Sequence, residues 1–182
     1  MIHFYDSHTL PVSRWRNGGG ETREIISFPP AATDFSWRIS IATIAADGAF
    51  SRFPGIDRVI TLLEGEGVEL DAEDKYRQLL IRNQPFAFAG EDLIHARLIG
   101  NVSSDFNVMT RRETHQAGVR VLSDTFSPDS AASGVVYVLA GEWITGDLRL
   151  QQGQGAWWQS HGQTLEPISS AALLLIAVIR EK

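Results

Sequence analysis

The chain consists largely of short segments that are rich in β-branched and aromatic residues and are bounded by Gly, Pro, Asn or Asp. This pattern is typical of an all-β sandwich or barrel, and helical periodicity is nearly absent. The segment 37–44 alternates most clearly, with Trp37 and Ile39 on one face of a strand and Arg38 and Ser40 on the other. Further strands are expected at 22–27, 58–64, 67–71, 78–81, 85–89, 95–99, 105–110, 118–123, 134–140, 141–145, 148–151, 156–159, 164–167 and 172–180.

Two series of these segments follow the same order, which indicates an internal repeat. In each series an apolar strand ends in a glycine turn, at 62–65 and at 138–141, and a short hairpin follows. Each series then closes with a final apolar strand, at 106–109 and at 176–179. The repeat predicts tandem jelly-roll barrels of the cupin kind.

The expected arrangement is an all-β bicupin in which two tandem cupin-like barrels share one core. We expect the first barrel at about 1–110, a crossover at about 111–133 and the second barrel at about 134–182. A chain of 182 residues fits one such unit, because hydrophobic cores continue to grow above this size.

The charge and the amino-acid usage exclude several classes of function. The net charge is −6, so the average field repels phosphate and no nucleic-acid partner is expected. The chain has no cysteine, which fits a reducing compartment and makes the cytoplasm the expected location. The longest apolar stretch, 171–179, is too short to cross a membrane, and no export signal is visible at the start of the chain.

Four blocks of the sequence stand out as a set. The most distinctive is WRNGGGETREI at 15–25, and the others are DFSWRISIA at 34–42, FSRFPGIDR at 50–58 and FNVMTR at 106–111. These blocks resemble those of the HutD/Ves family in order and approximate spacing, and the chain looks closest to the Ves branch. The resemblance implies a bicupin fold.

For the HutD branch, the resemblance also implies control of histidine catabolism through binding of a small carboxylate metabolite, such as urocanate or a formylglutamate-like compound. Members of the Ves branch are similar to HutD without a clear tie to histidine use. The pathway therefore stays open at this point.

The histidines do not form the ligand set of a metal-dependent cupin. Such proteins present paired histidines and a glutamate in a first motif and another histidine in a second. The corresponding first region, 48–67, has no histidine, and single histidines occur at His95 and His161 in the later regions. Neither a metal nor another cofactor is expected.

Arg38 and Arg58 are the main candidates for ligand binding, because each lies within a strand-like run rather than in a loop. An enclosed guanidinium needs an anion, which is either a carboxylate of the protein or the carboxylate of a ligand. Glu24 and Asp57 are the candidate internal partners, and a mixed case with one structural and one ligand-facing arginine is also open.

Further candidates for ligand binding are aromatic side chains that can stack, neutral hydrogen-bonding groups and glycines that allow close backbone approach. The complete expected set is Trp15, Asn17, Gly18, Gly19, Thr22, Glu24, Arg38, Ser40, Phe53, Arg58 and Asn107. The glycines also fit a tight turn that contacts no ligand. Asn107, in the middle of an expected strand, needs a hydrogen-bond partner if it is buried.

The leading hypothesis is a non-catalytic protein that binds a small carboxylate metabolite and regulates a pathway, with a homodimer as an open oligomeric state. The first alternative is a metal-independent enzyme that uses Glu24, Asp57 or Glu64 as an acid or base. The second is a structural or interaction module whose arginines are all paired internally. No nucleophile motif is visible, and no catalytic residue is assigned.

Overall fold

The computed structural model describes residues 1–182 and contains strands but no helices. The all-β prediction is therefore confirmed. No helix is present that is long and apolar enough to span a membrane. The chain divides into two compact units, one formed by Pro11–His115 and the other by Met1–Leu10 together with Gln116–Lys182.

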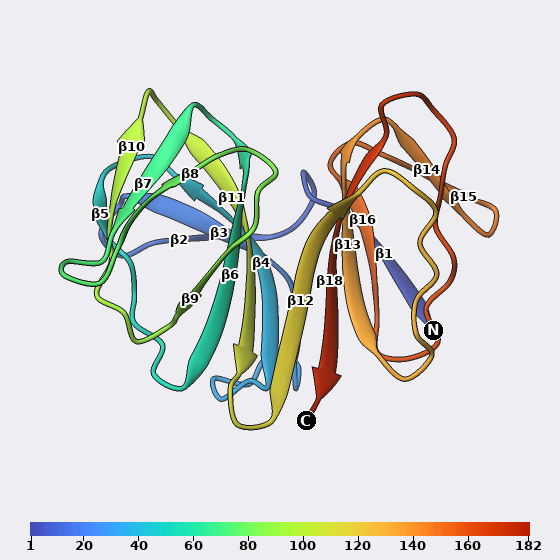
Figure 1. Ribbon diagram of the computed structural model, residues 1–182, viewed down its shortest axis with the longest axis horizontal. Coiled ribbons are helices and arrows are strands. Elements are labelled where there is room, and N and C mark those ends of the chain that lie inside the picture. Colours follow the sequence, from blue (N-terminus) through green and yellow to red (C-terminus); the bar gives the residue numbers. More distant parts are fainter. The chain divides into compact units, whose positions relative to one another are not determined.

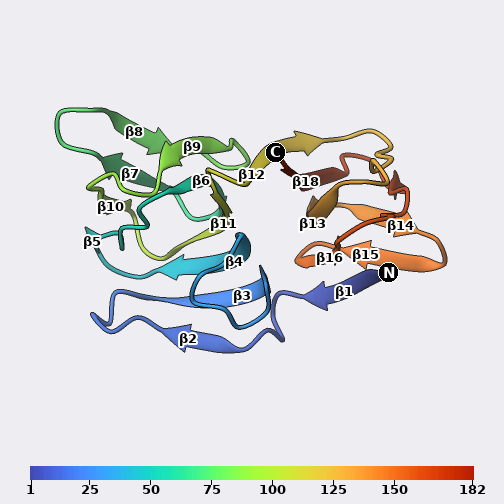
Figure 2. The ribbon, with the colours of Figure 1, turned by 90° about the horizontal axis from the view of Figure 1, so that it is seen from below.

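The unit Pro11–His115 contains a larger and a smaller antiparallel sheet (Figures 1 and 2). The six-stranded sheet has the order β2 (Val12–Arg14), β3 (Gly20–Phe28), β4 (Trp37–Ile44), β11 (Ser103–Arg111), β6 (Ile56–Glu64), β9 (Phe86–Ala89). The four-stranded sheet has the order β5 (Gly48–Ala49), β10 (His95–Ile99), β7 (Gly67–Asp71), β8 (Arg77–Leu80).

The other unit repeats this plan with a larger and a smaller sheet. The five-stranded sheet has the order β1 (Ile2–Asp6), β16 (Gln154–Trp158), β13 (Ser133–Ala140), β18 (Leu173–Glu181), β12 (His115–Leu122). The three-stranded sheet has the order β15 (Leu148–Gln151), β14 (Glu142–Thr145), β17 (Glu166–Pro167).

Each unit has an apolar cluster of its own, to which both of its sheets contribute. In the unit Pro11–His115, Ile60 of β6 packs with Leu70 of β7 and both are fully buried. In the other unit, Val136 of β13 packs with Trp143 of β14. The β-branched and aromatic residues that predict strands thus also form the cores, because alternate positions face inward.

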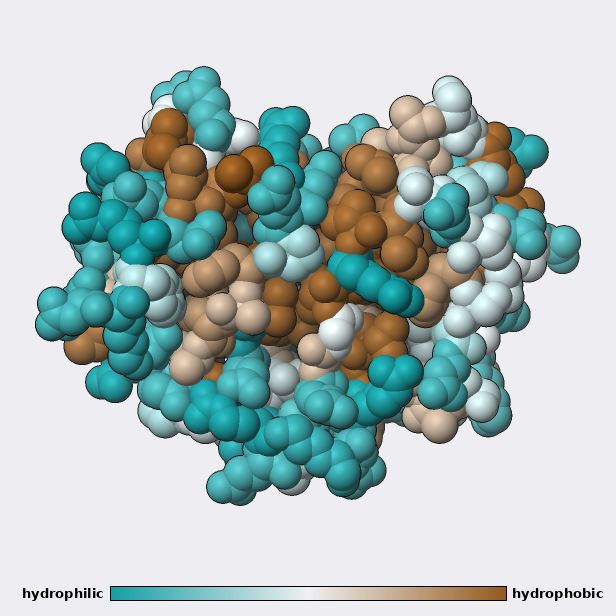
Figure 3. All heavy atoms as spheres, viewed as in Figure 1, coloured by the Kyte–Doolittle hydropathy of each residue, from teal (hydrophilic) through white to brown (hydrophobic).

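The smaller sheet of the unit Pro11–His115 has one buried and one exposed face. Leu70 and Ala96 face its core, whereas Leu79 and Ile99 are 44% and 37% exposed. Figure 3 shows hydrophobic residues among hydrophilic ones where β7, β8 and β10 lie. The alternation along these strands therefore reflects a sheet that is covered on one side.

The structure differs from the expected division of the chain at two places. Residues 2–6, expected in the first barrel, form β1 and pair with β16. Residues 115–122, within the expected crossover, form β12 at the edge of the five-stranded sheet. The physical reason is strand pairing. The unpaired backbone N–H and C=O groups at a sheet edge can bond to an extended segment from any part of the sequence.

Gly155 allows β1 to pack closely against its sheet, and a substitution at this position tests that packing. A Cβ at Gly155 would overlap the Val136 carbonyl oxygen and the Tyr5 ring, whose hydroxyl donates to that same carbonyl oxygen at 2.8 Å. We expect Gly155→Ala to lower the free energy of unfolding by about 2 kcal/mol or more through overpacking. Urea denaturation measures this difference.

Gly118→Ala is the matched control, because no heavy atom lies within 4 Å of a Cβ built at this position in β12. Its expected effect is within about 0.5 kcal/mol of wild type. Equal denaturation midpoints for the two variants would contradict the close packing of β1 on β16 and β13.

Candidate functional site

A cavity of about 470 Å³ lies within the unit Pro11–His115. Its wall is formed by the large sheet, by the turn that connects β2 to β3, and by the segment that follows β5. The lining residues are Arg14, Trp15, Arg16, Asn17, Thr22, Arg38, Ser40, Ala42, Ile44, Ala49, Phe50, Ser51, Phe53, Arg58, Asp105, Asn107 and Met109.

Strand register brings the polar lining residues onto one face of the sheet. Met109 of β11 lies opposite Arg38 of β4 and also opposite Arg58 of β6. Two residues earlier on β11, Asn107 lies opposite Ser40. Because side chains alternate along a strand, these positions all point to the same side. The predicted polar face of the segment 37–44 is the face that lines the cavity.

Arg58 is buried at the floor of this cavity, with 7% of the residue exposed. Its guanidinium carbon lies 5.5, 5.4 and 4.9 Å from the ring centroids of Phe50, Phe53 and Phe88. Nη2 donates to Asn107 Oδ1 at 3.0 Å, whereas Nε has no hydrogen-bond partner. Burial lowers the pKa of Arg58 to about 10, so the group still carries its charge at neutral pH.

Asp105 is the second buried charged group of the floor, and 1% of the residue is exposed. Its Oδ1 accepts a hydrogen bond from Asn107 Nδ2, whereas Oδ2 has no partner. Burial raises the pKa of Asp105 to about 7, although the nearby Arg58 and the bond from Asn107 act in the opposite direction. Asp105 therefore changes its protonation state near neutral pH.

Arg58, Asn107 and Asp105 form a hydrogen-bonded chain. Asn107 accepts from Arg58 through its carbonyl oxygen and donates to Asp105 through its amide nitrogen. The buried Asn107 thus has the hydrogen-bond partners that a buried amide side chain needs. The chain leaves one donor, Nε of Arg58, and one acceptor, Oδ2 of Asp105, without a protein partner.

Arg38 pairs with a carboxylate of the protein, which was one of the two alternatives for an enclosed arginine. Its Nε donates to Glu24 Oε1 at 2.7 Å, and the two side chains are 28% and 44% exposed. Glu24 does not line the cavity. Arg38 therefore lies in an ion pair with a protein carboxylate, whereas Arg58 lies in none.

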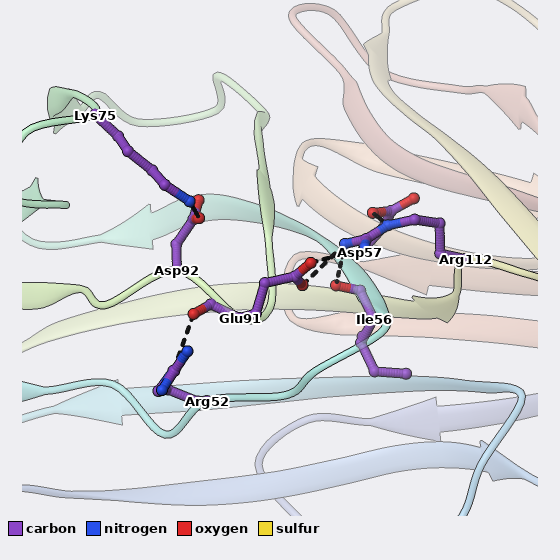
Figure 4. A network of polar contacts seen from close by, with 7 residues as sticks. All are labelled: Arg52, Ile56, Asp57, Lys75, Glu91, Asp92 and Arg112. Carbon is purple, nitrogen blue, oxygen red and sulfur yellow. Dashed lines mark hydrogen bonds and ion pairs between the residues drawn. The ribbon is translucent and has the colours of Figure 1, made fainter.

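Asp57, the other candidate internal partner, does not pair with Arg58. It accepts from Arg112 Nε at 2.7 Å, and Arg112 also binds both carboxylate oxygens of Glu91 at 2.7 and 2.9 Å (Figure 4). The physical reason is strand alternation, because Asp57 and Arg58 are consecutive in β6 and point to opposite faces.

The glycine block forms the tight turn between β2 and β3. Gly18 has a φ of +73°, which favours glycine, and the Gly19 N–H donates to Asn17 Oδ1 at 2.9 Å. Trp15, whose Nε1 donates to Thr22 Oγ1 at 2.8 Å, lines the cavity together with Asn17 and Thr22. The two glycines themselves do not line it, so their turn positions the side chains around them.

The structure brings eight of the expected site residues to the cavity: Trp15, Asn17, Thr22, Arg38, Ser40, Phe53, Arg58 and Asn107. Gly18, Gly19 and Glu24 lie outside its lining. Sequence reasoning missed Asp105, which is the first residue of the expected strand 105–110. Its signal is its spacing, since it lies two residues before Asn107 on the same strand face.

The charged lining of the cavity is mostly positive. Arg14, Arg16, Arg38 and Arg58 supply four guanidinium groups, and Asp105 is the one acidic residue among the lining residues. This local excess occurs in a chain whose net charge is −6. The cavity is therefore electrostatically suited to an anion.

The lining residues do not fit the metal site of a metal-dependent cupin. Such a site needs imidazole and carboxylate ligands, and this lining offers one carboxyl group and no histidine. No group of three or more His, Asp or Glu side chains lies close enough together to hold a metal ion.

The antiparallel sheets and the cavity define a cupin-like all-β protein with an arginine-rich pocket. The HutD family model matches residues 7–175, so the chain belongs to the HutD/Ves family. It is 46% identical over 179 residues to protein Ves of Escherichia fergusonii, covering 98% of this chain and 94% of the relative. Protein Ves of Citrobacter koseri is 47% identical over the same length, with 98% and 94% covered.

Solved structures agree with this assignment. HutD from Pseudomonas fluorescens SBW25 superposes with a TM-score of 0.86 and 28% identity, covering 100% of both chains. Protein Ylba from E. coli, of the DUF861 family, has a TM-score of 0.76 and 9% identity, covering 98% of this chain and 90% of the other, and shares the fold alone. The family resemblance expected from the sequence is therefore confirmed.

The raised pKa of Asp105 predicts how stability depends on pH. Between its ordinary value of 3.8 and about 7, the unfolded chain has released a proton that the folded protein retains, so wild type loses stability as pH rises through this window. Asp105→Asn removes this dependence. We compare the free energy of unfolding of the variant with that of wild type at each pH. Urea denaturation should show this difference shifting in favour of the variant by at least about 2 kcal/mol from pH 4 to pH 7.

Asp92→Asn is the matched control, because Asp92 is also buried but its pKa is lowered, chiefly by the hydrogen bond from Lys75 (Figure 4). The ionised Asp92 carboxylate therefore stabilises the folded protein at neutral pH, and this stabilisation is lost as pH falls below the ordinary pKa of 3.8. The difference between this variant and wild type should shrink on acidification. Parallel stability curves for Asp105→Asn and wild type would contradict a buried carboxyl group at position 105.

Proposed function

We propose that this protein binds a small carboxylate metabolite in the cavity of the unit Pro11–His115 and acts without catalysing a reaction. The observation that carries the proposal is Arg58, whose buried guanidinium lines the cavity with an unpaired Nε–H and forms no ion pair with a protein carboxylate. A buried donor on a charged group is costly when it is left unsatisfied. A carboxylate ligand relieves that cost.

The surroundings of Arg58 support a carboxylate in particular. A guanidinium presents N–H groups in a planar fork that matches the two oxygens of a carboxylate. The rings of Phe50 and Phe53 hold the fork in place and exclude water, which strengthens the interaction. Arg14 and Arg16 at the wall of the cavity add to the attraction of an anion.

The dimensions of the cavity fit a metabolite rather than a filled structural core. A volume of about 470 Å³ lies within the range of small-molecule sites, and the lining combines aromatic residues with a few polar groups. A module with only structural arginines needs no such space. The cavity therefore favours the binding protein over the structural module.

We also infer the bicupin arrangement and a regulatory role. Each unit combines a larger and a smaller antiparallel sheet around its own apolar cluster, which supports one cupin-like barrel per unit. A non-catalytic binding protein regulates a pathway by sequestering or sensing its ligand. The family resemblance makes urocanate and formylglutamate the first ligands to test, and with them a link to histidine utilisation.

One observation favours an enzyme as a second candidate. Asp105 has a pKa of about 7 and lies in the cavity, and such a group can accept and return a proton at neutral pH. The carboxylates first considered, Glu24, Asp57 and Glu64, do not line the cavity. Turnover of a metabolite mixture that is followed by mass spectrometry and lost in Asp105→Asn would favour this candidate.

Arg58 provides the direct test of carboxylate binding. We expect calorimetric titration of wild type with a panel that includes urocanate and formylglutamate to show binding that Arg58→Ala weakens by at least about 100-fold. The reason is that the variant loses a charge-assisted hydrogen bond and the only buried guanidinium among the lining residues. Arg58→Lys keeps the charge without the fork and should lose at least about tenfold.

Arg97→Ala is the matched control, because Arg97 is an exposed arginine of β10 that pairs with Glu69 outside the cavity. It removes the same charge from the protein and should leave binding unchanged. Absence of binding by folded wild type across the whole panel would overturn the proposal. Full affinity in Arg58→Ala would do the same.

A further inference from the structure

Asp105 and Arg58 both line the cavity, and each has one buried polar atom without a partner, the acceptor Oδ2 of Asp105 and the donor Nε–H of Arg58. We propose that Asp105 is a specificity-determining residue, which selects carboxylates that also carry an N–H donor, such as an amide or an imidazole, over isosteric carboxylates without one. The proposal rests on the proposed function, because Arg58 binds the carboxylate and Asp105 accepts a hydrogen bond from the neighbouring N–H group of the ligand.

The hydrogen-bonded chain determines which atom of Asp105 faces the ligand. Arg58 can only donate, so the Asn107 atom that it contacts is the carbonyl oxygen. The other Asn107 atom is consequently the amide nitrogen, which donates to Oδ1 of Asp105. Oδ2 is left for the ligand, and its role as an acceptor follows from the direction of the chain.

The charged groups around Asp105 favour a ligand that carries an N–H donor. Arg58 of β6 is the charged group that acts on Asp105, and Arg38 of β4 and Tyr76 act on Arg58 in turn. A bound carboxylate would share the charge of Arg58 with Asp105, leaving two negative groups beside one positive group. An N–H on the ligand compensates Oδ2 directly, and Oδ2 then has the partner that the protein does not supply.

An asparagine at position 105 reverses this preference. Its Oδ1 must accept from Asn107, because Asn107 presents its amide nitrogen on that side. The amide nitrogen of the new side chain then takes the place of Oδ2 and presents a donor. Asp105→Asn thus exchanges an acceptor for a donor at one point of the cavity, with little change in shape.

Two probes that differ at a single atom test the proposal. N-benzoylglycine carries an amide N–H beside its carboxylate, and O-benzoylglycolate carries an ester oxygen in the same place. Calorimetric titration at pH 8.5 keeps Asp105 ionised, because its pKa is about 7. We expect wild type to bind the amide at least about tenfold more tightly than the ester, and Asp105→Asn to prefer the ester.

Asp57→Asn is the matched control, since Asp57 is an exposed aspartate that pairs with Arg112 outside the cavity. It should keep the preference of wild type for the amide. Equal affinities of wild type for the two probes, with both lost in Arg58→Ala, would overturn the role of Asp105 and leave carboxylate binding intact. Absence of binding for both probes, and for the carboxylate panel, would overturn both proposals.

A measurement on wild type alone covers the case in which Asp105→Asn does not fold. At pH 5.5 the Asp105 carboxyl is protonated, and the proton must lie on Oδ2 because Oδ1 accepts from Asn107. Oδ2 then donates, and the preference for the amide should disappear relative to pH 8.5. An amide-to-ester ratio that is the same at both pH values would overturn the proposal.

Discussion

The burial of one guanidinium constrains the rest of this site. Arg58 lies on β6, between β11 and the edge strand β9 of the six-stranded sheet, and water does not reach its Nε. The protein compensates the buried charge with three aromatic rings, an amide acceptor and a nearby carboxyl group. It leaves the compensation incomplete at two buried atoms, Nε of Arg58 and Oδ2 of Asp105, whose residues both line the cavity. The chemistry of the site follows from this incompleteness.

Much of the large sheet could be predicted from the sequence, because its strands alternate strongly and end at turn residues. The strand Trp37–Ile44 begins and ends where the alternation does, and the face that carries Arg38 and Ser40 is the cavity face. Arg58 and Asn107 stand out for the same reason, as polar residues within apolar runs. The alternation also implies that Asp57 and Arg58 point to opposite faces, so it could have excluded their pairing.

Other parts of the structure depend on contacts that no local pattern contains. Asp105 becomes a floor residue because β11 pairs with both β4 and β6, and this pairing is known only from the folded sheet. The strand Ile2–Asp6 has no clear period and joins a sheet formed by residues more than a hundred positions away, from Gln116 onward. Long-range pairing of this kind decides which edge a short segment joins, and propensity does not.

The proposed function implies that a cupin-like cavity can hold an anion without histidines. In a metal-dependent cupin, a cation held by imidazole and carboxylate ligands supplies the positive charge. Here the fixed charge of Arg58 occupies the floor, and Asn107 connects it to an acid that moderates it. A guanidinium adds direction as well as charge, since its N–H groups lie in one plane. Under the role proposed for Asp105, selectivity depends on hydrogen-bond polarity, which a single residue can set and a single substitution can reverse.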